Sequence, residues 1–212
     1  MKIWLLDSLG FQRLINKKER TIIISYRGDV FHMALPQEHI FTAEDYWNLP
    51  EGKRAELING KFYDMAPPSR IHQKLVLSLS RKIADYIDAQ NGECEVYIAP
   101  FAVNLQADDK TYVEPDISII CDKSKLDERG CKGSPDFIIE VVSPSSRRMD
   151  YSTKNFLYLE AGVREYWIVD PKNKQTTVYR YEEDEAPNIF AFSESITVGI
   201  YKNLQIVVGD FL

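Results

Sequence analysis

Two acidic residues lie inside otherwise apolar stretches of the sequence, where a charged side chain needs a physical reason. Asp116 follows Pro115 within YVEPDISII, and Glu140 lies within PDFIIEVVS. A carboxylate in a buried strand is costly unless it is paired or bound to a metal. If the two strands are neighbours, both carboxylates can point to one face of a sheet. Two hard oxygen donors on a rigid sheet suit Mg²⁺ or Mn²⁺. The alternative is a pair of acids that form salt bridges with a buried Arg or Lys.

A third acidic candidate, Glu56, lies in the short stretch 54–58. By the two-residue period of a strand, Glu56 and Ile58 share one face. Glu56 can therefore join a cluster of carboxylates, or it can be an exposed residue of an edge strand.

Lys154 lies in the helix predicted after Glu140, on the same stripe as Leu157, Tyr158 and Ala161. A lysine on an apolar, sheet-facing stripe can extend toward a neighbouring carboxylate. The alternative is an ion pair with Asp150 one turn earlier, which stabilises a helix by only a few tenths of a kcal/mol.

Other kinds of chemistry find no support in the sequence. There is no G-x-S-x-G motif, no glycine-rich phosphate loop, and no zinc-type spacing among the cysteines. The three histidines are His32, His39 and His72. His72 falls in the first turn of the long helix that begins after Ser69, where we expect a structural or capping role.

The elements that must position these residues follow from local patterns. Thr42 is a good N-cap for a short helix through Leu49, and Asn59-Gly60 is a strong hairpin signal. Apolar residues at helical spacing predict a long helix from Ser69 to about Gln90. The remaining expected elements are strands 94–105, 112–121 and 136–143, a helix 148–161 that ends at Gly162, strands 165–170 and 176–181, and short strands in the tail. This order predicts a mixed α/β sheet flanked by helices.

Residues 1–35 differ in character from the rest, and we interpret them as an N-terminal extension. The segment 21–26 could form one isolated strand. Met33 begins a stretch that would itself be a plausible start, so we expect the core to be independent of residues 1–32. The remaining residues, 36–212, are expected to form one domain.

Composition excludes several classes of protein. The chain has 212 residues, a formal net charge of −6 and 44% hydrophobic residues, which favours a packed globular fold over a disordered one. The net acidity argues against a general nucleic-acid coating protein, although it allows a local basic patch. The apolar runs are far too short to span a membrane. The odd number of cysteines, Cys94, Cys121 and Cys131, predicts no disulfide framework. We therefore expect a soluble, cytoplasmic protein.

Longer segments carry a resemblance to a known family. Pro115-Asp116 followed by Glu140 resembles the PD-(D/E)XK superfamily of metal-dependent nucleases. The segments AELING, VEPDISIICD, GSPDFIIEVVSPSSRRMD and YLEAGVREYWIVDP resemble the large bacterial Uma-type family of restriction-endonuclease-like proteins. This resemblance spans about Phe41 to Tyr181. It implies a restriction-endonuclease-like α/β core and divalent-metal hydrolysis of phosphodiester bonds, most simply in DNA.

The resemblance also implies roles for particular residues. Asp116 and Glu140 would bind the metal with the main-chain oxygen of Val141, and Glu56 matches the Glu that the N-terminal part of the fold contributes. The superfamily lysine should stand two residues after Glu140, where this sequence has Val142. Lys154 would take its place from the helix and stabilise charge in the transition state.

Basic residues near these acids are candidates for contacts with nucleic acid. Arg147 and Arg148 could hold the phosphates that flank the cleaved bond. A second basic cluster, more often a solvated surface, is formed by Lys123, Lys125, Arg129 and Lys132.

Two main functions remain open from the sequence, beside the hydrolysis of a phosphoester that is not nucleic acid. The first is an active Mg²⁺- or Mn²⁺-dependent endonuclease, for which a homodimer is a fair expectation because it must cut both strands. The second is a catalytically inactive, nuclease-like scaffold that binds nucleic acid or a protein partner, which the substitution at Val142 favours. The retained acids Asp116 and Glu140 favour the first.

Overall fold

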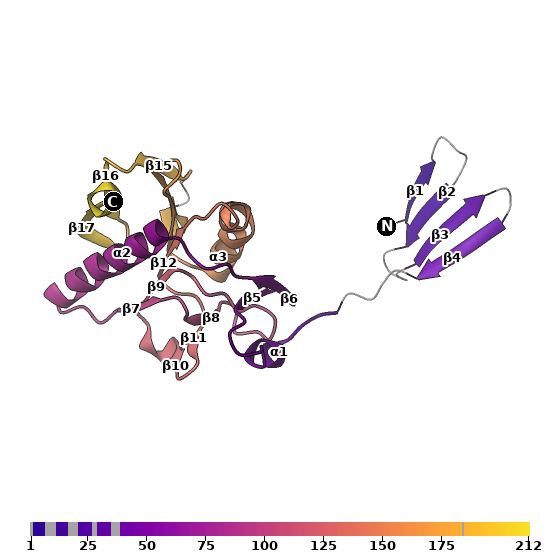
Figure 1. The fold of residues 1–212 in the computed structure, drawn as a ribbon, viewed down its shortest axis with the longest axis horizontal. Helices are drawn as coiled ribbons and strands as arrows, with labels where there is room; N and C mark the ends of the chain where they lie inside the picture. The colour runs from indigo at the N-terminus through magenta and orange to yellow at the C-terminus, as the bar shows by residue number, and fades with distance from the viewer. Residues whose placement is uncertain (1, 7–11, 17–20, 27–28, 35–38, 184) are drawn as a thin grey trace. The chain divides into compact units, whose positions relative to one another are not determined.

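The computed structural model describes residues 2–6, 12–16, 21–26, 29–34, 39–183 and 185–212 (Figure 1). The chain divides into two compact units, Met1–His39 and Ile40–Leu212. Among the described residues, no helix is long and apolar enough to cross a membrane.

The N-terminal unit contains a four-stranded antiparallel sheet in the order β1-β2-β3-β4. The strand expected at 21–26 is present as β3, but it is not isolated: it pairs with β2 and β4, which the sequence pattern did not indicate. Met33 lies within the last strand, so a chain starting there would keep little of this sheet. The four strands are β1 (Lys2–Leu6), β2 (Gln12–Asn16), β3 (Thr21–Tyr26) and β4 (Asp29–Ala34).

The larger unit is built on a six-stranded mixed sheet in the order β15-β14-β13-β12-β9-β7, which confirms the predicted α/β class. Only β12 and β13 are parallel, and every other adjacent pair is antiparallel. A parallel pair needs a crossover, here a π-helix, Met149–Lys154, continued by α3, Asn155–Ala161. The strands are β7 (Glu95–Ile98), β9 (Ile117–Ile120), β12 (Phe137–Val141), β13 (Glu165–Asp170), β14 (Gln175–Arg180) and β15 (Asn188–Ala191).

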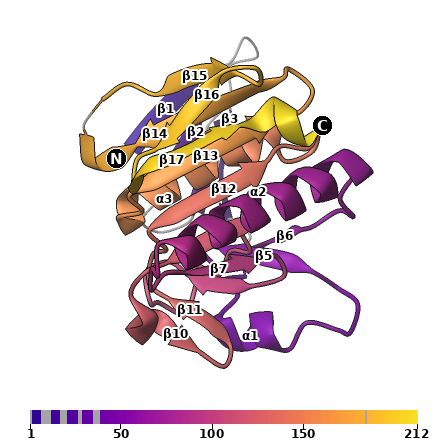
Figure 2. The same ribbon diagram turned by 90° about the vertical axis from the view of Figure 1, so that its left-hand side faces the viewer.

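Each face of the central sheet is covered by different elements. The long helix α2 (Arg70–Ala89) and the hairpin β16 (Ser195–Val198) and β17 (Tyr201–Val207) pack on one face (Figure 2). That face includes Ile139, whereas Ile138 belongs to the cluster that packs against α3 on the other face. Because side chains alternate along a strand, Glu140 points to the same side as Ile138, toward α3.

Smaller elements surround one edge of this sheet. They are α1 (Ala43–Trp47), the hairpin β5 (Ala55–Ile58) and β6 (Lys61–Asp64), and a three-stranded sheet of β8 (Ala102–Asn104), β10 (Leu126–Asp127) and β11 (Gly130–Lys132). Short 3₁₀ segments occur at Lys123–Lys125, Tyr181–Glu183 and Val208–Phe211.

Local signals for helix and hairpin ends are confirmed. The Thr42 amide donates to the Asp45 carboxylate (2.8 Å), and the Ser69 hydroxyl accepts from the His72 amide (3.2 Å). Asn59 and Gly60 adopt φ of 51° and 75°, as a tight hairpin turn requires. Gly162 ends α3 with φ of 81°.

Two expected long strands are wrong in extent. The predicted strand 94–105 breaks into β7 and β8 around Pro100, because proline has no amide hydrogen with which to continue the ladder. In the predicted strand 112–121, only Ile117–Ile120 is β9, while Tyr112 and Val113 form isolated bridges before Pro115. The chain therefore changes sheets at both prolines.

The prediction that the cysteines form no disulfide is also wrong. Cys94 and Cys121 are joined, while Cys131 is a buried free thiol. The antiparallel pairing of β7 with β9 sets Glu95 opposite Ile120. Cys94 precedes Glu95 and Cys121 follows Ile120, so the pairing places the two cysteines opposite each other. Counting cysteines cannot reveal such a pair, because only the register of the strands brings them together.

Reduction of this disulfide is expected to lower the free energy of unfolding by about 2–4 kcal/mol, because the bond closes a loop across a sequence separation of 27 residues. Urea unfolding with and without dithiothreitol measures this loss. A Cys94→Ser, Cys121→Ser variant is the control and should be insensitive to the reductant. An unchanged midpoint on reduction of the wild-type protein would contradict the prediction.

Candidate functional site

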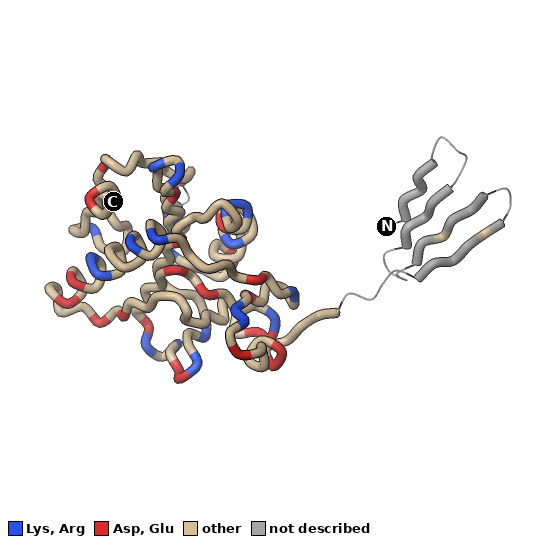
Figure 3. Tube along the Cα trace, viewed as in Figure 1, with Lys and Arg blue, Asp and Glu red and all other residues tan. Residues whose placement is uncertain are grey.

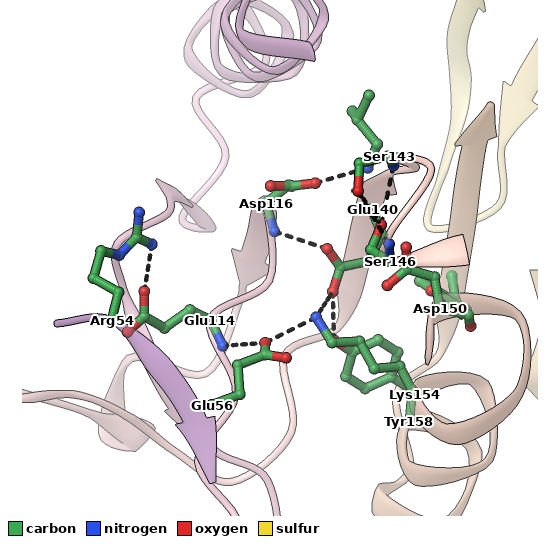
Figure 4. Close-up of polar contacts among 12 residues, drawn as sticks. Arg54, Glu56, Glu114, Asp116, Glu140, Ser143, Ser146, Asp150, Lys154 and Tyr158 are labelled. Atoms are coloured by element: carbon green, nitrogen blue, oxygen red, sulfur yellow. Dashed lines mark hydrogen bonds and ion pairs between the residues drawn. The ribbon is translucent and has the colours of Figure 1, made fainter. Parts of the chain in front are cut away.

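Lys154 lies between two glutamates that come from different parts of the chain. Its Nζ is 2.8 Å from Oε1 of Glu56 on β5 and 2.8 Å from Oε1 of Glu140 on β12 (Figure 4). All three side chains are about 5–6% exposed. Lys154 therefore points toward the sheet, and its ammonium joins two carboxylates in the interior.

Asp116 and Glu140 are linked through the backbone of their neighbouring strands. The amide of Asp116 donates to Oε2 of Glu140 (3.3 Å), and the amide of Val141 donates to Oδ2 of Asp116 (2.8 Å). Antiparallel pairing of β9 with β12 sets Ile117 opposite Ile139 and so brings the two acids side by side. The structure thus unites Glu56, Asp116, Glu140 and Lys154 in one site.

Tyr158 also holds Glu140. One turn after Lys154, its hydroxyl donates to the same Oε1 of Glu140 at 2.7 Å. Its position on the helical stripe was visible in the sequence, but nothing there indicated the role. Burial raises the pKa of the Tyr158 phenol well above its usual range, so Tyr158 acts as a donor at all ordinary pH values.

The cluster contains more carboxyl groups than one lysine can neutralise. Burial raises the pKa of Glu140 well above its usual range; Lys154 opposes this shift, and Asp116, Asp150 and Glu56 reinforce it. Burial alone would lower the pKa of Lys154, but attraction to Glu140, Glu56 and Asp150 outweighs it and holds that pKa well above the usual value. Lys154 therefore stays charged, and several carboxyl groups share this one cation.

Asp150 is the fourth acid of the cluster. It lies in the first turn of the π-helix that ends at Lys154, and its side chain is buried. Burial raises its pKa to about 6, with Lys154 acting in the opposite direction. The folded state therefore binds more protons than the unfolded state between about pH 4 and pH 6, and Asp150 costs stability as the pH rises through that window.

Asp150→Asn is expected to raise the free energy of unfolding by roughly 2–3 kcal/mol at pH 7.5 without divalent metal, because a shift of one pKa unit corresponds to about 1.4 kcal/mol. At pH 4 the wild-type side chain is already largely protonated when folded, so the gain should nearly vanish. Urea unfolding in EDTA at both pH values tests this. An equal gain at both, or none at pH 7.5, would show that the aspartate charge is not the cause.

His72 contacts the site in a way that the sequence pattern did not predict. Its backbone is capped by Ser69 as expected, but Nε2 of its ring lies 3.0 Å from Oδ2 of Asp116. Its Nδ1 is buried without a hydrogen-bond partner among the described residues. The N-terminal turn of α2 therefore reaches the acid cluster, which only the packing of α2 on the sheet could reveal.

A second polar group supports Glu56 from its other side. The Glu114 amide donates to Oε1 of Glu56 (2.9 Å), and the Glu114 carboxylate accepts from the hydroxyl of Tyr46 (3.1 Å) and from Arg54 (2.5 Å). Figure 4 shows this Arg54–Glu114 pair continuing the row of side chains away from Lys154. The row is thus anchored at α1 and β5 as well as at the central sheet.

Some of the basic residues expected to contact phosphates have partners within the protein, and others are exposed. Arg147 forms an ion pair with the buried Asp170 and lies over the Tyr151 ring, and Arg148 is exposed.

In the second basic cluster, Lys123 pairs with Glu95, and Lys125 donates to the Ser134 carbonyl. Arg129 lies over Trp47, and Lys132 is exposed. Figure 3 shows that Lys and Arg are spread over the larger unit, with no single continuous basic face in that view.

Comparison with known proteins places this arrangement in a family. A model of the Uma2 family, described as "Putative restriction endonuclease", matches residues 43–208. The chain belongs to the Uma2 family. Its match begins at α1 and ends after β17, so it includes every residue of the acid cluster and excludes the N-terminal sheet.

The chain is also similar to two curated proteins and to one solved structure. Proteins slr1290 and sll1609 of Synechocystis sp. are each 24% identical, over 66% and 65% of this chain and 74% and 79% of their own length. A crystal structure from Anabaena variabilis, described as "a putative nuclease belonging to DUF820", is 21% identical and covers 81% of this chain and 97% of its own, with a TM-score of 0.65. This likeness confirms the mixed α/β fold predicted from the sequence.

Proposed function

We propose that this Uma2 protein is a divalent-metal-dependent endonuclease that hydrolyses phosphodiester bonds in DNA. The observation that carries the proposal is the row Glu56–Lys154–Glu140–Asp116, which four separate segments assemble and which is buried up to the half-buried Asp116. Such a row costs stability, and the family to which the chain belongs is described as restriction endonucleases. The contact of Lys154 with Glu140 supports the assignment of Lys154 to the role of the lysine missing at Val142, and it weakens the main argument for an inactive scaffold.

The residues present fit a hard divalent cation such as Mg²⁺ or Mn²⁺. Within the described ranges no three His, Cys, Asp or Glu side chains form a ready-made metal site. Mg²⁺ is commonly held by one or two carboxylates, with water and substrate phosphates completing its shell. Asp116, Glu140 and the main-chain oxygen of Val141 are the donors that we assign, because the backbone hydrogen bonds of their neighbouring strands hold the two carboxyl groups side by side.

The roles of the chain's own residues follow from their contacts. Lys154 uses hydrogen bonds to Glu56 and Glu140 to hold its charge in place, so its positive charge is preorganised to stabilise the transition state. Tyr158 orients Glu140, and Val141 and His72 orient Asp116. A bound metal would lower the pKa of water and neutralise charge on the phosphate.

Calorimetric titration of Mn²⁺ tests the metal site without requiring a known substrate. We expect binding to the wild-type protein that Asp116→Ala abolishes, and that Asp85→Ala leaves unchanged because Asp85 is an exposed residue of α2. Equal binding to wild type and Asp116→Ala, or none to either at millimolar metal, would contradict the proposal and favour a scaffold. A homodimer and a cytoplasmic location remain predictions from the sequence.

A further inference from the structure

A groove lies beside the acid cluster, between α1 and the turn that joins β10 to β11. It consists of two adjoining cavities of about 410 and 430 Å³. Each falls in the lower part of the range of roughly 300–1,000 Å³ typical of small-ligand sites. The residues that line both cavities are Trp47, Ala102, Asp127, Arg129 and Gly130.

Aromatic side chains form the walls of this groove. Tyr46 and Tyr112 stack with ring centroids 5.0 Å apart, and Trp47 stands edge-on to both, at 5.0 and 5.7 Å. Tyr97 and Phe101 stack at 4.1 Å with an interplanar angle of 10°. Trp47 is 39% exposed although it lies among these rings. An exposed tryptophan in an aromatic cavity is well suited to stacking against a flat ligand.

The charges of the groove select among flat ligands. Glu114, Asp127 and Glu128 line the first cavity. Among the described residues that line it, Arg129 is the one basic side chain, and its guanidinium lies 5.4 Å from the Trp47 ring centroid. Glu114 is neutralised by its ion pair with Arg54, which leaves Asp127 and Glu128 to repel the phosphates of a nucleic-acid backbone. These carboxylates favour a ring with hydrogen-bond donors on its edge, such as the amino groups of adenine, cytosine and guanine.

The groove is connected to the acid cluster through Glu114. Glu114 lines the first cavity, and its amide donates to Glu56. Asp116 follows two residues later, and two extended residues span at most ~7 Å. Stacked nucleotides rise by ~3.4 Å each, so the backbone of Glu114 lies within about two nucleotides of Asp116, where we assign the metal that would face the cleaved phosphate.

We propose that this groove binds an unstacked nucleobase of the substrate strand, stacked on Trp47 next to the cleaved bond. The preferred substrate is then DNA with a single-stranded or flipped-out nucleotide near the cleavage position, an inference that rests on the proposed nuclease function for its biological meaning. Enzymes that take a base out of the helix hold it by stacking and by hydrogen bonds to its edge. The aromatic walls and acidic rim supply both.

Fluorescence anisotropy in EDTA tests the groove independently of cleavage. The probe is a labelled single strand of about twelve nucleotides, compared with an oligonucleotide of the same length that carries abasic sites and therefore the same phosphates without bases. We expect the full-length protein to prefer the strand with bases. Trp47→Ala and Tyr97→Ala should each weaken that binding by about 5- to 100-fold, the range of base–aromatic stacking. Phe156→Ala, an exposed aromatic of α3, is the control.

The outcomes separate this inference from the proposed function. Equal binding of the abasic strand, or normal binding by both folded groove variants, would overturn the inference even if the protein cleaves duplex DNA in Mn²⁺. Trp47-dependent binding would support the groove even if Mn²⁺ fails to bind at Asp116. Tighter binding of a trimethyl-lysine peptide than of the oligonucleotide would also overturn it, because an aromatic and acidic pocket suits such a cation.

Discussion

Lys154→Met is expected to lower the free energy of unfolding by about 3–5 kcal/mol at pH 7.5, because it leaves two buried carboxylates without their cation. Lys154 is the shared partner of Glu56 and Glu140, and both lie in the interior with it. The tyrosine hydroxyl that also reaches Glu140 is a neutral donor and cannot replace the charge. The same change should strongly reduce cleavage, because it removes the fixed positive charge of the site.

The pH dependence of this loss identifies its cause. In the variant the pKa of Glu140 should rise further, because the attraction of Lys154 no longer opposes the effect of burial. A carboxyl whose folded pKa lies above its unfolded value costs stability as the pH rises, so the deficit should shrink at pH 5. Lys53→Met is the control, because Lys53 pairs with Asp64 at the surface and should lose less than about 1 kcal/mol. A loss no larger than in this control would refute the central role of Lys154.

Asp116→Asn is expected to reduce cleavage of supercoiled plasmid in Mn²⁺ by roughly 1,000-fold, because a bound metal supplies several kcal/mol of charge stabilisation and each 1.4 kcal/mol is a tenfold change in rate. Stability should be unchanged or higher. The amide oxygen can still accept from the Val141 backbone, while one negative charge leaves the cluster.

Three comparisons make this result specific. Wild-type protein in EDTA should not cleave, and Asp85→Asn, a change at the surface of α2, should cleave at the wild-type rate. Urea unfolding should show that the Asp116→Asn protein is folded. Cleavage by a folded Asp116→Asn protein at the wild-type rate would sink the assignment of Asp116 as a metal ligand.

Elements set by local chemistry could be predicted almost to the residue. Thr42 with Asp45, the Asn59-Gly60 turn and Gly162 each act through contacts or dihedral preferences within a few residues. The predicted extents of the two long strands were wrong for a related reason. Their apolar pattern continues past Pro100 and Pro115, but a proline cannot donate to a ladder, and the chain leaves the sheet there.

In the candidate site too, some features could be predicted from the sequence and others could not. Residue types and spacing singled out Asp116, Glu140 and Lys154, because an acid in an apolar strand and a lysine on an apolar stripe both need a partner. The contact of His72 with Asp116 and the support of Glu56 by Glu114 were missed. Each joins segments more than forty residues apart, with no local pattern that distinguishes these residues from surface charges.

The sequence by itself determined the class of this protein, its helix and hairpin ends, and the kinds of side chain that its chemistry requires. Only the tertiary structure decided which of these side chains meet. The antiparallel register of β9 on β12 brings Asp116 beside Glu140, and the crossover to β13 turns Lys154 toward both β12 and β5. The same packing joins Cys94 to Cys121 and forms the aromatic groove. Register and packing are properties of the whole buried core, and for that reason no short stretch of sequence specifies them.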